Sequence, residues 1–184
     1  MADPNSLPQS PETLAGGFLS SNGASGLLGV TLVSNAQRSD GTHVCMRLGW
    51  RAELCRSATS ASLHAGAIIT AIDSAMGMCG MQFMQASSGV ATLDFRYDEF
   101  SAPAPGADVF VEAHCARLDG DILFITGSCR SADGKVLHGR ATGRFIRTAA
   151  NSVPFTATML SMQSTALPRT SSAASVSPAA PGEE

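Results

Sequence analysis

One ionisable side chain interrupts a long apolar stretch of this sequence. Between His64 and Met84 most residues are Ala, Gly, Ile or Met, and Asp73 is the single acid. A carboxylate buried without a partner in such surroundings costs several kcal/mol. We therefore expect Asp73 to have a hydrogen-bonding partner such as Thr70 or Ser74, to face a wet cavity, or to take part in a reaction.

The apolar stretch itself predicts a buried helix. A helix that is hydrophobic on every side belongs in a protein core or in a membrane, and about 20 apolar residues are enough to span a bilayer. However, a central Asp is costly in lipid, no basic flank marks an orientation, and the sequence that follows alternates as strands do. We therefore expect a core helix covered by a sheet.

Strand-like segments lie on both sides of this helix. Before it, residues 27–34 and 42–50 are separated by the turn Ser39-Asp40-Gly41. After it, the segments are 90–100, 107–118, 122–131 and 136–147, and two further Asp-Gly turns join the last three. Tight turns between alternating runs favour an antiparallel meander. The prediction is an α+β fold with five to six antiparallel strands wrapped around one long apolar central helix.

Composition separates this domain from the ends of the chain. Residues 1–25 are rich in Pro, Ser and Gly and predict a flexible lead-in, and residues 149–184 are a low-complexity tail that we expect to be disordered. The domain is predicted to span residues 26–148. Because the sequence opens without a recognisable signal segment, the expected location is the cytoplasm.

Charge and cysteine usage argue against several function classes. The chain has 184 residues, a formal net charge of −3 and singly scattered basic residues, so we expect no nucleic-acid partner. Its five Cys are odd in number and show no C-x-x-C spacing, which supports neither a disulfide framework nor a zinc site. We expect no metal and no cofactor. The G-x-S-x-G, P-loop and G-x-G-x-x-G motifs do not occur.

The start of the helix and the strand after it resemble a known family. His64-Ala65-Gly66 opens the helix, Asp73 follows nine residues after His64, and Thr92 lies near the start of the next strand. Together with the later Pro-x-Pro-Gly break, this pattern resembles the hotdog-fold acyl-CoA thioesterases of the phenylacetyl-CoA (PaaI-type) branch over residues 26–147. The resemblance implies a hotdog fold and hydrolysis of an acyl-CoA, or a related thioester, to a free acid and a thiol.

The resemblance also implies a role for each of these residues. The backbone N–H of Ala65, with Gly66 beside it, would donate to the thioester carbonyl, since first-turn N–H groups have no helical partner. Asp73 would act as general base or nucleophile from across a dimer interface. Thr92 would hold the water or the acid, and His64 would line the acyl pocket.

The sequence departs from the family pattern at two positions. Ala65 stands where the family has Gly, so a methyl group crowds the approach of the carbonyl. The family also has an Asn before the His, and its place falls at about Arg56, where no Asn occurs. We expect Arg56 and Met76 to contact the substrate, although Ser57, Thr59 or Ser60 are alternatives to Arg56.

Three functions therefore remain open. The first is the thioesterase, with coenzyme A present only as part of the substrate. The second is a hotdog hydratase or dehydratase, and the third is a hotdog protein that binds acyl-CoA without turning it over. Because one helix cannot cover the whole of a six-stranded sheet, we expect a homodimer or homotetramer in each case.

Overall fold

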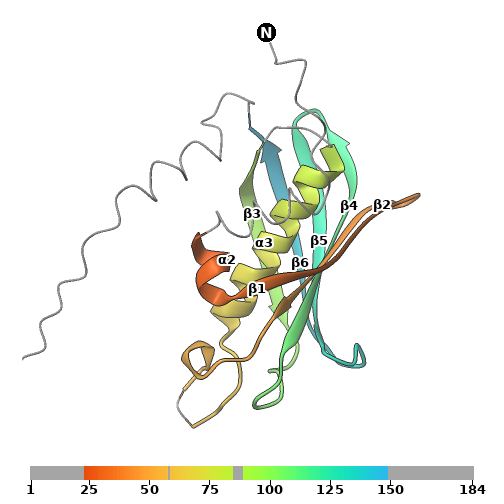
Figure 1. Cartoon of the computed structure of the whole chain (residues 1–184). Coiled ribbons are helices and arrows are strands. Elements are labelled where there is room, and N and C mark those ends of the chain that lie inside the picture. The colour runs from red at the N-terminus through yellow and green to blue at the C-terminus, as the bar shows by residue number, and fades with distance from the viewer. Residues whose placement is uncertain (1–22, 58, 85–88, 149–184) are drawn as a thin grey trace, which may run out of the picture.

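A computed structural model of the chain describes residues 23–57, 59–84 and 89–148 (Figure 1). Most of the predicted lead-in and the whole predicted tail lie outside the described residues. The elements, in chain order, are α2 (Gly23–Leu28), β1 (Val30–Arg38), β2 (Gly41–Leu48), the 3-10 turn η1 (Ala52–Leu54), α3 (Ala65–Met84), β3 (Val90–Glu99), β4 (Val109–Asp119), β5 (Ile122–Ser131) and β6 (Leu137–Arg147).

The strands form one antiparallel sheet in the order β1-β2-β4-β5-β6-β3, and α3 lies along one face of it (Figure 1). The predicted α+β hotdog architecture is confirmed. Gly41, Gly120 and Gly134 follow the Asp of each predicted turn and have φ angles of 133°, 59° and 73°. Residues other than glycine rarely adopt such backbone angles, so glycine at these positions favours the tight turns of the hairpins.

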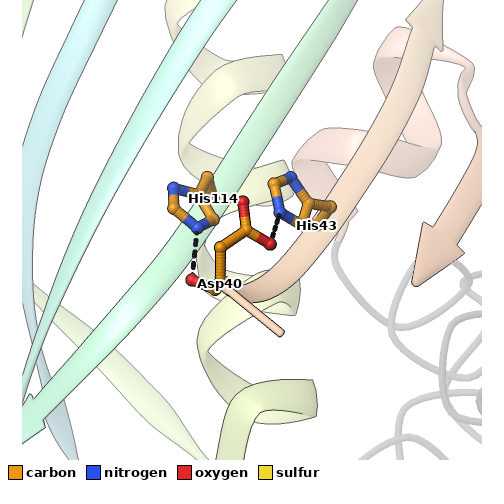
Figure 2. Close-up of side chains that lie close together, drawn as sticks. All are labelled: Asp40, His43 and His114. Atoms are coloured by element: carbon orange, nitrogen blue, oxygen red, sulfur yellow. Dashed lines mark hydrogen bonds and ion pairs between the residues drawn. The ribbon is translucent and has the colours of Figure 1, made fainter. Parts of the chain in front are cut away.

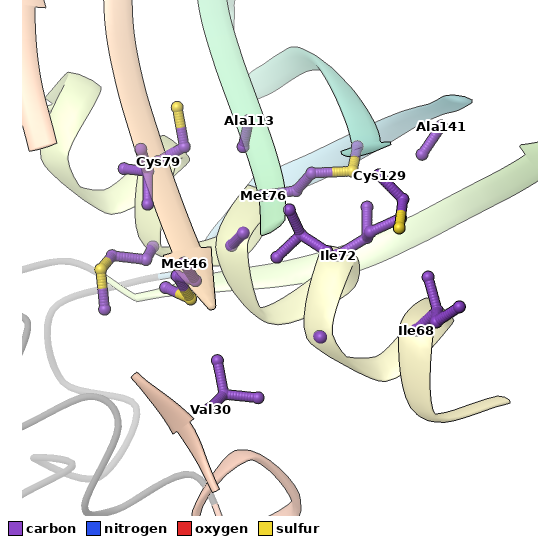
Figure 3. Packing of buried hydrophobic residues seen from close by; sticks show 14 of the residues in the cluster. Val30, Met46, Ile68, Ile72, Met76, Cys79, Ala113, Cys129 and Ala141 are labelled. Atoms are coloured by element: carbon purple, nitrogen blue, oxygen red, sulfur yellow. The ribbon is translucent and has the colours of Figure 1, made fainter. Parts of the chain in front are cut away.

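Helix α3 supplies the centre of the core. Ile68, Ile72 and Met76 are fully buried between the helix and the strands (Figure 3), and each such side chain contributes roughly 1.5–3 kcal/mol. Gly127 lets the helix approach β5, since a Cβ there would lie 2.9 Å from Ile72 Cγ2. Among the described residues, α3 alone is long and apolar enough to cross a membrane. However, 61% of its most apolar 18-residue stretch is buried inside the fold.

The segment before β1 differs from the prediction. Leu27 and Leu28 were expected in a strand but belong to α2, and β1 begins at Val30. The Ser25 hydroxyl is buried and lies 2.5 Å from the Ser74 hydroxyl on α3, while Arg51 Nη2 donates to Leu27 O at 2.6 Å. These contacts join distant parts of the chain, and therefore no local pattern indicates them.

Candidate functional site

Asp73 lies near the middle of α3 and is half-buried beside the edge strand β3. Thr92 Oγ1 donates a hydrogen bond to Asp73 Oδ1 at 3.0 Å. Burial raises the pKa of Asp73, and the hydrogen bond from Thr92 opposes part of that rise. Thr70, considered above as a partner, instead donates its hydroxyl to Gly66 O at 2.9 Å. The structure thus brings together Asp73 and Thr92, two of the residues predicted for the site.

The two backbone N–H groups predicted as donors, at the start of α3, differ in their hydrogen bonding. His64 precedes the helix, and its Nδ1 accepts a hydrogen bond from Gly66 N–H at 2.9 Å. His64 O accepts from the N–H groups of Ala67 and Ile68. Within the described residues, Ala65 N–H has no acceptor. Of the two predicted donors, Ala65 N–H is therefore the one without an acceptor in the described part of the chain, whereas Gly66 N–H already donates to His64.

Ala65 N–H and the Asp73 carboxylate lie far apart on the same helix. The two residues are eight positions apart, and an α-helix rises about 1.5 Å per residue, so about 12 Å of helix axis separates them. A base and an oxyanion donor must each lie about 3 Å from the reacting atoms of one thioester. If Ala65 N–H is the oxyanion donor and Asp73 the base, this separation favours taking the two groups from two different chains.

Arg56, predicted to contact substrate, lies in an ion pair with Glu99 at the end of β3. Its Nε also donates to Leu63 O at 3.3 Å. The guanidinium group thus attaches the loop before α3 to the neighbouring strand, next to the start of the helix. Sequence reasoning missed Glu99, because the two residues are 43 positions apart and neither belongs to a motif.

Met76, also predicted to contact substrate, is not brought together with the residues at the start of α3. Its side chain has 0% exposure and packs in the core (Figure 3). Met76 Sδ would lie 3.2 Å from a Cβ at Gly127, and its Cε 3.1 Å from a Cβ at Gly143. The Met76 side chain therefore lies between α3 and the sheet, where it packs against strands β5 and β6.

An open hollow of about 320 Å³ lies beside the first turn of α3. The residues that line it come from α2, η1, the loop before α3 and α3 itself: Leu28, Glu53, Leu54, Cys55, His64, Gly66, Ala67 and Thr70. Two of the residues predicted for the site, His64 and Gly66, thus line the same hollow. The contribution of Leu28 was missed, because residues 27–34 were expected to form a strand.

The chain is similar in sequence to acyl-CoA thioesterases. No family model matches the chain. Acyl-coenzyme A thioesterase THEM4 of Bos taurus is 37% identical over 87 residues, and THEM4 of Rattus norvegicus is 35% identical over 86 residues. Each match covers 46% of this chain, but 33% and 35% of those relatives, so the chain spans about one third of their length.

Solved structures share the whole fold. A Pseudomonas aeruginosa protein has 25% identity and a TM-score of 0.63, covering 73% of this chain and 99% of that one. A Haemophilus influenzae thioesterase has 16% identity and a TM-score of 0.65, covering 79% and 94%. The Escherichia coli PaaI protein, from the phenylacetic acid degradation operon, has 13% identity and a TM-score of 0.58, covering 73% and 95%.

The sheet order and the enclosed helix define a hotdog-fold protein. The THEM4 thioesterases are similar to 46% of this chain, and the solved structures share its fold, in agreement with the fold and the family that the sequence resembles. The structural likeness to PaaI is a likeness of fold, and the branch stays a prediction.

Proposed function

We propose that this protein is an acyl-CoA thioesterase that hydrolyses its substrate to a free acid and coenzyme A. The observation that carries the proposal is the Asp73 carboxylate, half-buried on the core helix and hydrogen-bonded to Thr92 on an edge strand. The relatives named thioesterases support the same reaction class. A thiolate leaves readily, so one base and one oxyanion donor are enough for the chemistry.

In this proposal each residue has one task. Asp73 removes a proton from water or attacks the carbonyl carbon, and Thr92 holds the Asp73 carboxylate. Ala65 N–H donates to the carbonyl oxygen as negative charge develops there, at the helix terminus where the dipole favours that charge. His64 keeps the first turn capped, and the hollow beside it receives the acyl group. Arg56 and Glu99 hold the loop that borders this hollow.

The separation of Ala65 from Asp73 supports a working enzyme of at least two chains. One chain would supply Asp73 and Thr92, and its partner would supply Ala65 N–H. The edge strand β3 supports this arrangement, because Thr92 is exposed there and Leu93 remains 53% exposed. An exposed edge with apolar side chains is a surface that proteins usually cover.

The cytoplasmic location stays a prediction, tested by cell fractionation.

The deciding experiment is thiol release from a panel of aliphatic and aromatic acyl-CoAs. We expect the wild-type chain to release thiol from at least one member and Asp73→Asn to lower kcat/KM at least about a hundredfold. Asp119→Asn is the matched control, since Asp119 lies on the exposed end of β4 and pairs with Arg117. Both variants should keep the wild-type circular dichroism spectrum.

Two results of that experiment would redirect the proposal. If wild type binds acyl-CoA tightly but releases no thiol, the protein is a binding protein, and Ala65 together with the missing Asn explains the loss of turnover. If no thiol is released but 3-hydroxyacyl-CoA loses water, or 2-enoyl-CoA gains water, the chain is a dehydratase or hydratase. Unchanged hydrolysis by Asp73→Asn would refute the role of Asp73.

A further inference from the structure

Three side chains with metal-binding atoms converge on the face of the sheet opposite α3. Asp40 lies in the turn between β1 and β2, His43 lies on β2, and His114 lies on β4 directly across from His43. The neighbours of His43 on β2, Thr42 and Val44, are buried towards the helix. Because successive side chains of a strand point to opposite faces, His43 faces outwards, away from the Asp73 site.

The two imidazole rings are arranged around Asp40 (Figure 2). His43 Nε2 lies 3.0 Å from Asp40 Oδ1, and His114 Nε2 lies 2.9 Å from the backbone oxygen of Asp40. The ring centroids are 4.4 Å apart, with 18° between the ring planes. One ligand atom from each of the three residues lies within 4.8 Å of the others. The Asp40 side chain is 62% exposed, so an ion from solvent can reach the cluster.

We propose that Asp40, His43 and His114 form a zinc-binding site. Two imidazole nitrogens and one carboxylate oxygen are a ligand set that Zn²⁺ accepts, with the fourth tetrahedral position left to water. Zinc–ligand distances of about 2.0–2.2 Å require the three ligand atoms to approach one another to roughly 3.3–3.5 Å. The contact between His43 and Asp40 already meets this limit. To bind the ion, the His114 ring must turn away from its stacked position against His43. Its Nε2 must also give up the hydrogen bond to the Asp40 carbonyl.

The expectation of no metal rested on cysteine spacing, whereas this site contains no cysteine. Two of its ligands are 71 positions apart and meet only because β2 pairs with β4 in one register. A bound ion would connect the tip of the β1–β2 hairpin to β4. The alternative is that the three residues form a hydrogen-bonded cluster and nothing more, and the two explanations predict different metal binding.

The test is equilibrium dialysis of the full chain against Zn²⁺, with the bound metal measured by atomic emission. We expect one zinc ion per chain, a higher melting temperature with zinc, and at least about a tenfold loss of affinity in His43→Gln and in His114→Gln. In wild type, zinc should also shift the imidazole NMR signals of both residues. Equal zinc affinity in wild type and the two variants, or no zinc binding to wild type, would overturn the proposal.

Two control variants separate this site from other ways of binding zinc. Asp133→Asn changes an acid in an equivalent Asp-Gly turn with no histidine partner among the described residues, so it should leave zinc affinity unchanged. Cys45→Ser removes the thiol two positions beyond His43 and should also leave affinity unchanged. Loss of binding in Cys45→Ser with retention in both histidine variants would assign the zinc to a thiol and overturn the proposal. None of these measurements depends on thioester hydrolysis.

Discussion

At the scale of single residues, burial of Asp73 favours its neutral form, whereas its proposed role as a base requires the ionised form. Burial raises its pKa, which means that the folded chain binds this proton more tightly than the unfolded chain does. The stability that this protonation contributes is present in acid and is lost as the pH rises through the raised pKa. At pH values above this raised pKa, the folded protein carries an ionised group in a place that disfavours charge.

The first prediction is that Asp73→Asn stabilises the fold at neutral pH, because the variant removes the charge while Thr92 can still donate to the Asn oxygen. We expect the melting temperature to rise by a few degrees. The gain should shrink as the pH falls towards the ordinary carboxyl pKa of about 3.9. Thermal melts of both proteins across this pH range provide the measurement. A melting temperature that falls at neutral pH would contradict the prediction.

The second prediction concerns the hydroxyl that faces Asp73. Thr92→Val removes the hydrogen bond that lowers the pKa of Asp73, so this pKa should rise further. Since the base must be ionised, the acidic limb of the kcat/KM profile should move to higher pH. We also expect kcat/KM at neutral pH to fall about tenfold, the worth of one hydrogen bond of roughly 1–1.5 kcal/mol.

The control for this measurement is Thr142→Val, the same substitution at an exposed position of β6. Its pH profile should superimpose on that of wild type. A Thr92→Val profile that also superimposes would show that the hydroxyl does not act on the base, even if the rate is lower.

At the scale of elements, local sequence predicts most of what the structure contains. The apolar stretch from His64 to Met84 becomes α3, which begins one residue later at Ala65, and each predicted Asp-Gly turn closes a hairpin. These features depend on residues close together in the chain. The contact of Ser25 with Ser74 and the ion pair of Arg56 with Glu99 join residues 49 and 43 positions apart, so periodicity gives no sign of them.

The same limit applies to the candidate site. The position of Asp73 on the helix, the place of Ala65 in its first turn and the place of Thr92 on the next strand follow from the motif. The burial of Met76 does not, because the apolar residues of α3 look alike in sequence and only the packing of β5 and β6 selects those that face the core. The contribution of Leu28 to the lining of the hollow depends on α2, whose last two residues were predicted to begin a strand.

The third prediction uses the two neighbouring leucines of α2. Leu28 lines the hollow beside α3, whereas Leu27 is 80% exposed. Leu28→Ala should enlarge the hollow and shift the acyl preference towards longer or bulkier groups, with a relative gain in kcat/KM of about tenfold. Kinetics on an acyl-CoA series measure the shift. Leu27→Ala removes the same atoms and should leave the preference unchanged, and equal profiles for both variants would exclude α2 from the acyl pocket.

At the scale of the whole molecule, the fourth prediction tests whether a site is shared between chains. Asp73→Asn lacks the base, and Ala65→Pro lacks the backbone N–H, at the first helical position where proline is well tolerated. Each variant alone should be inactive. When both are unfolded together and refolded, half of the dimers contain one of each, and each mixed dimer has one intact site. We expect about one quarter of wild-type activity.

The measurement is thiol release by the refolded mixture, with each variant refolded alone as the control. A mixture as inactive as its components would mean that base and oxyanion donor belong to the same chain. The distance along α3 argues against that result.

The length of helix between Ala65 and Asp73 also has a consequence for how much enzyme a cell possesses. If each reaction centre needs two chains, then below the dissociation constant of the pair the reaction rate grows with the square of the chain concentration. Specific activity would fall on dilution, even though every chain stays folded. The level of expression would then set the fraction of chains that are competent as well as their number.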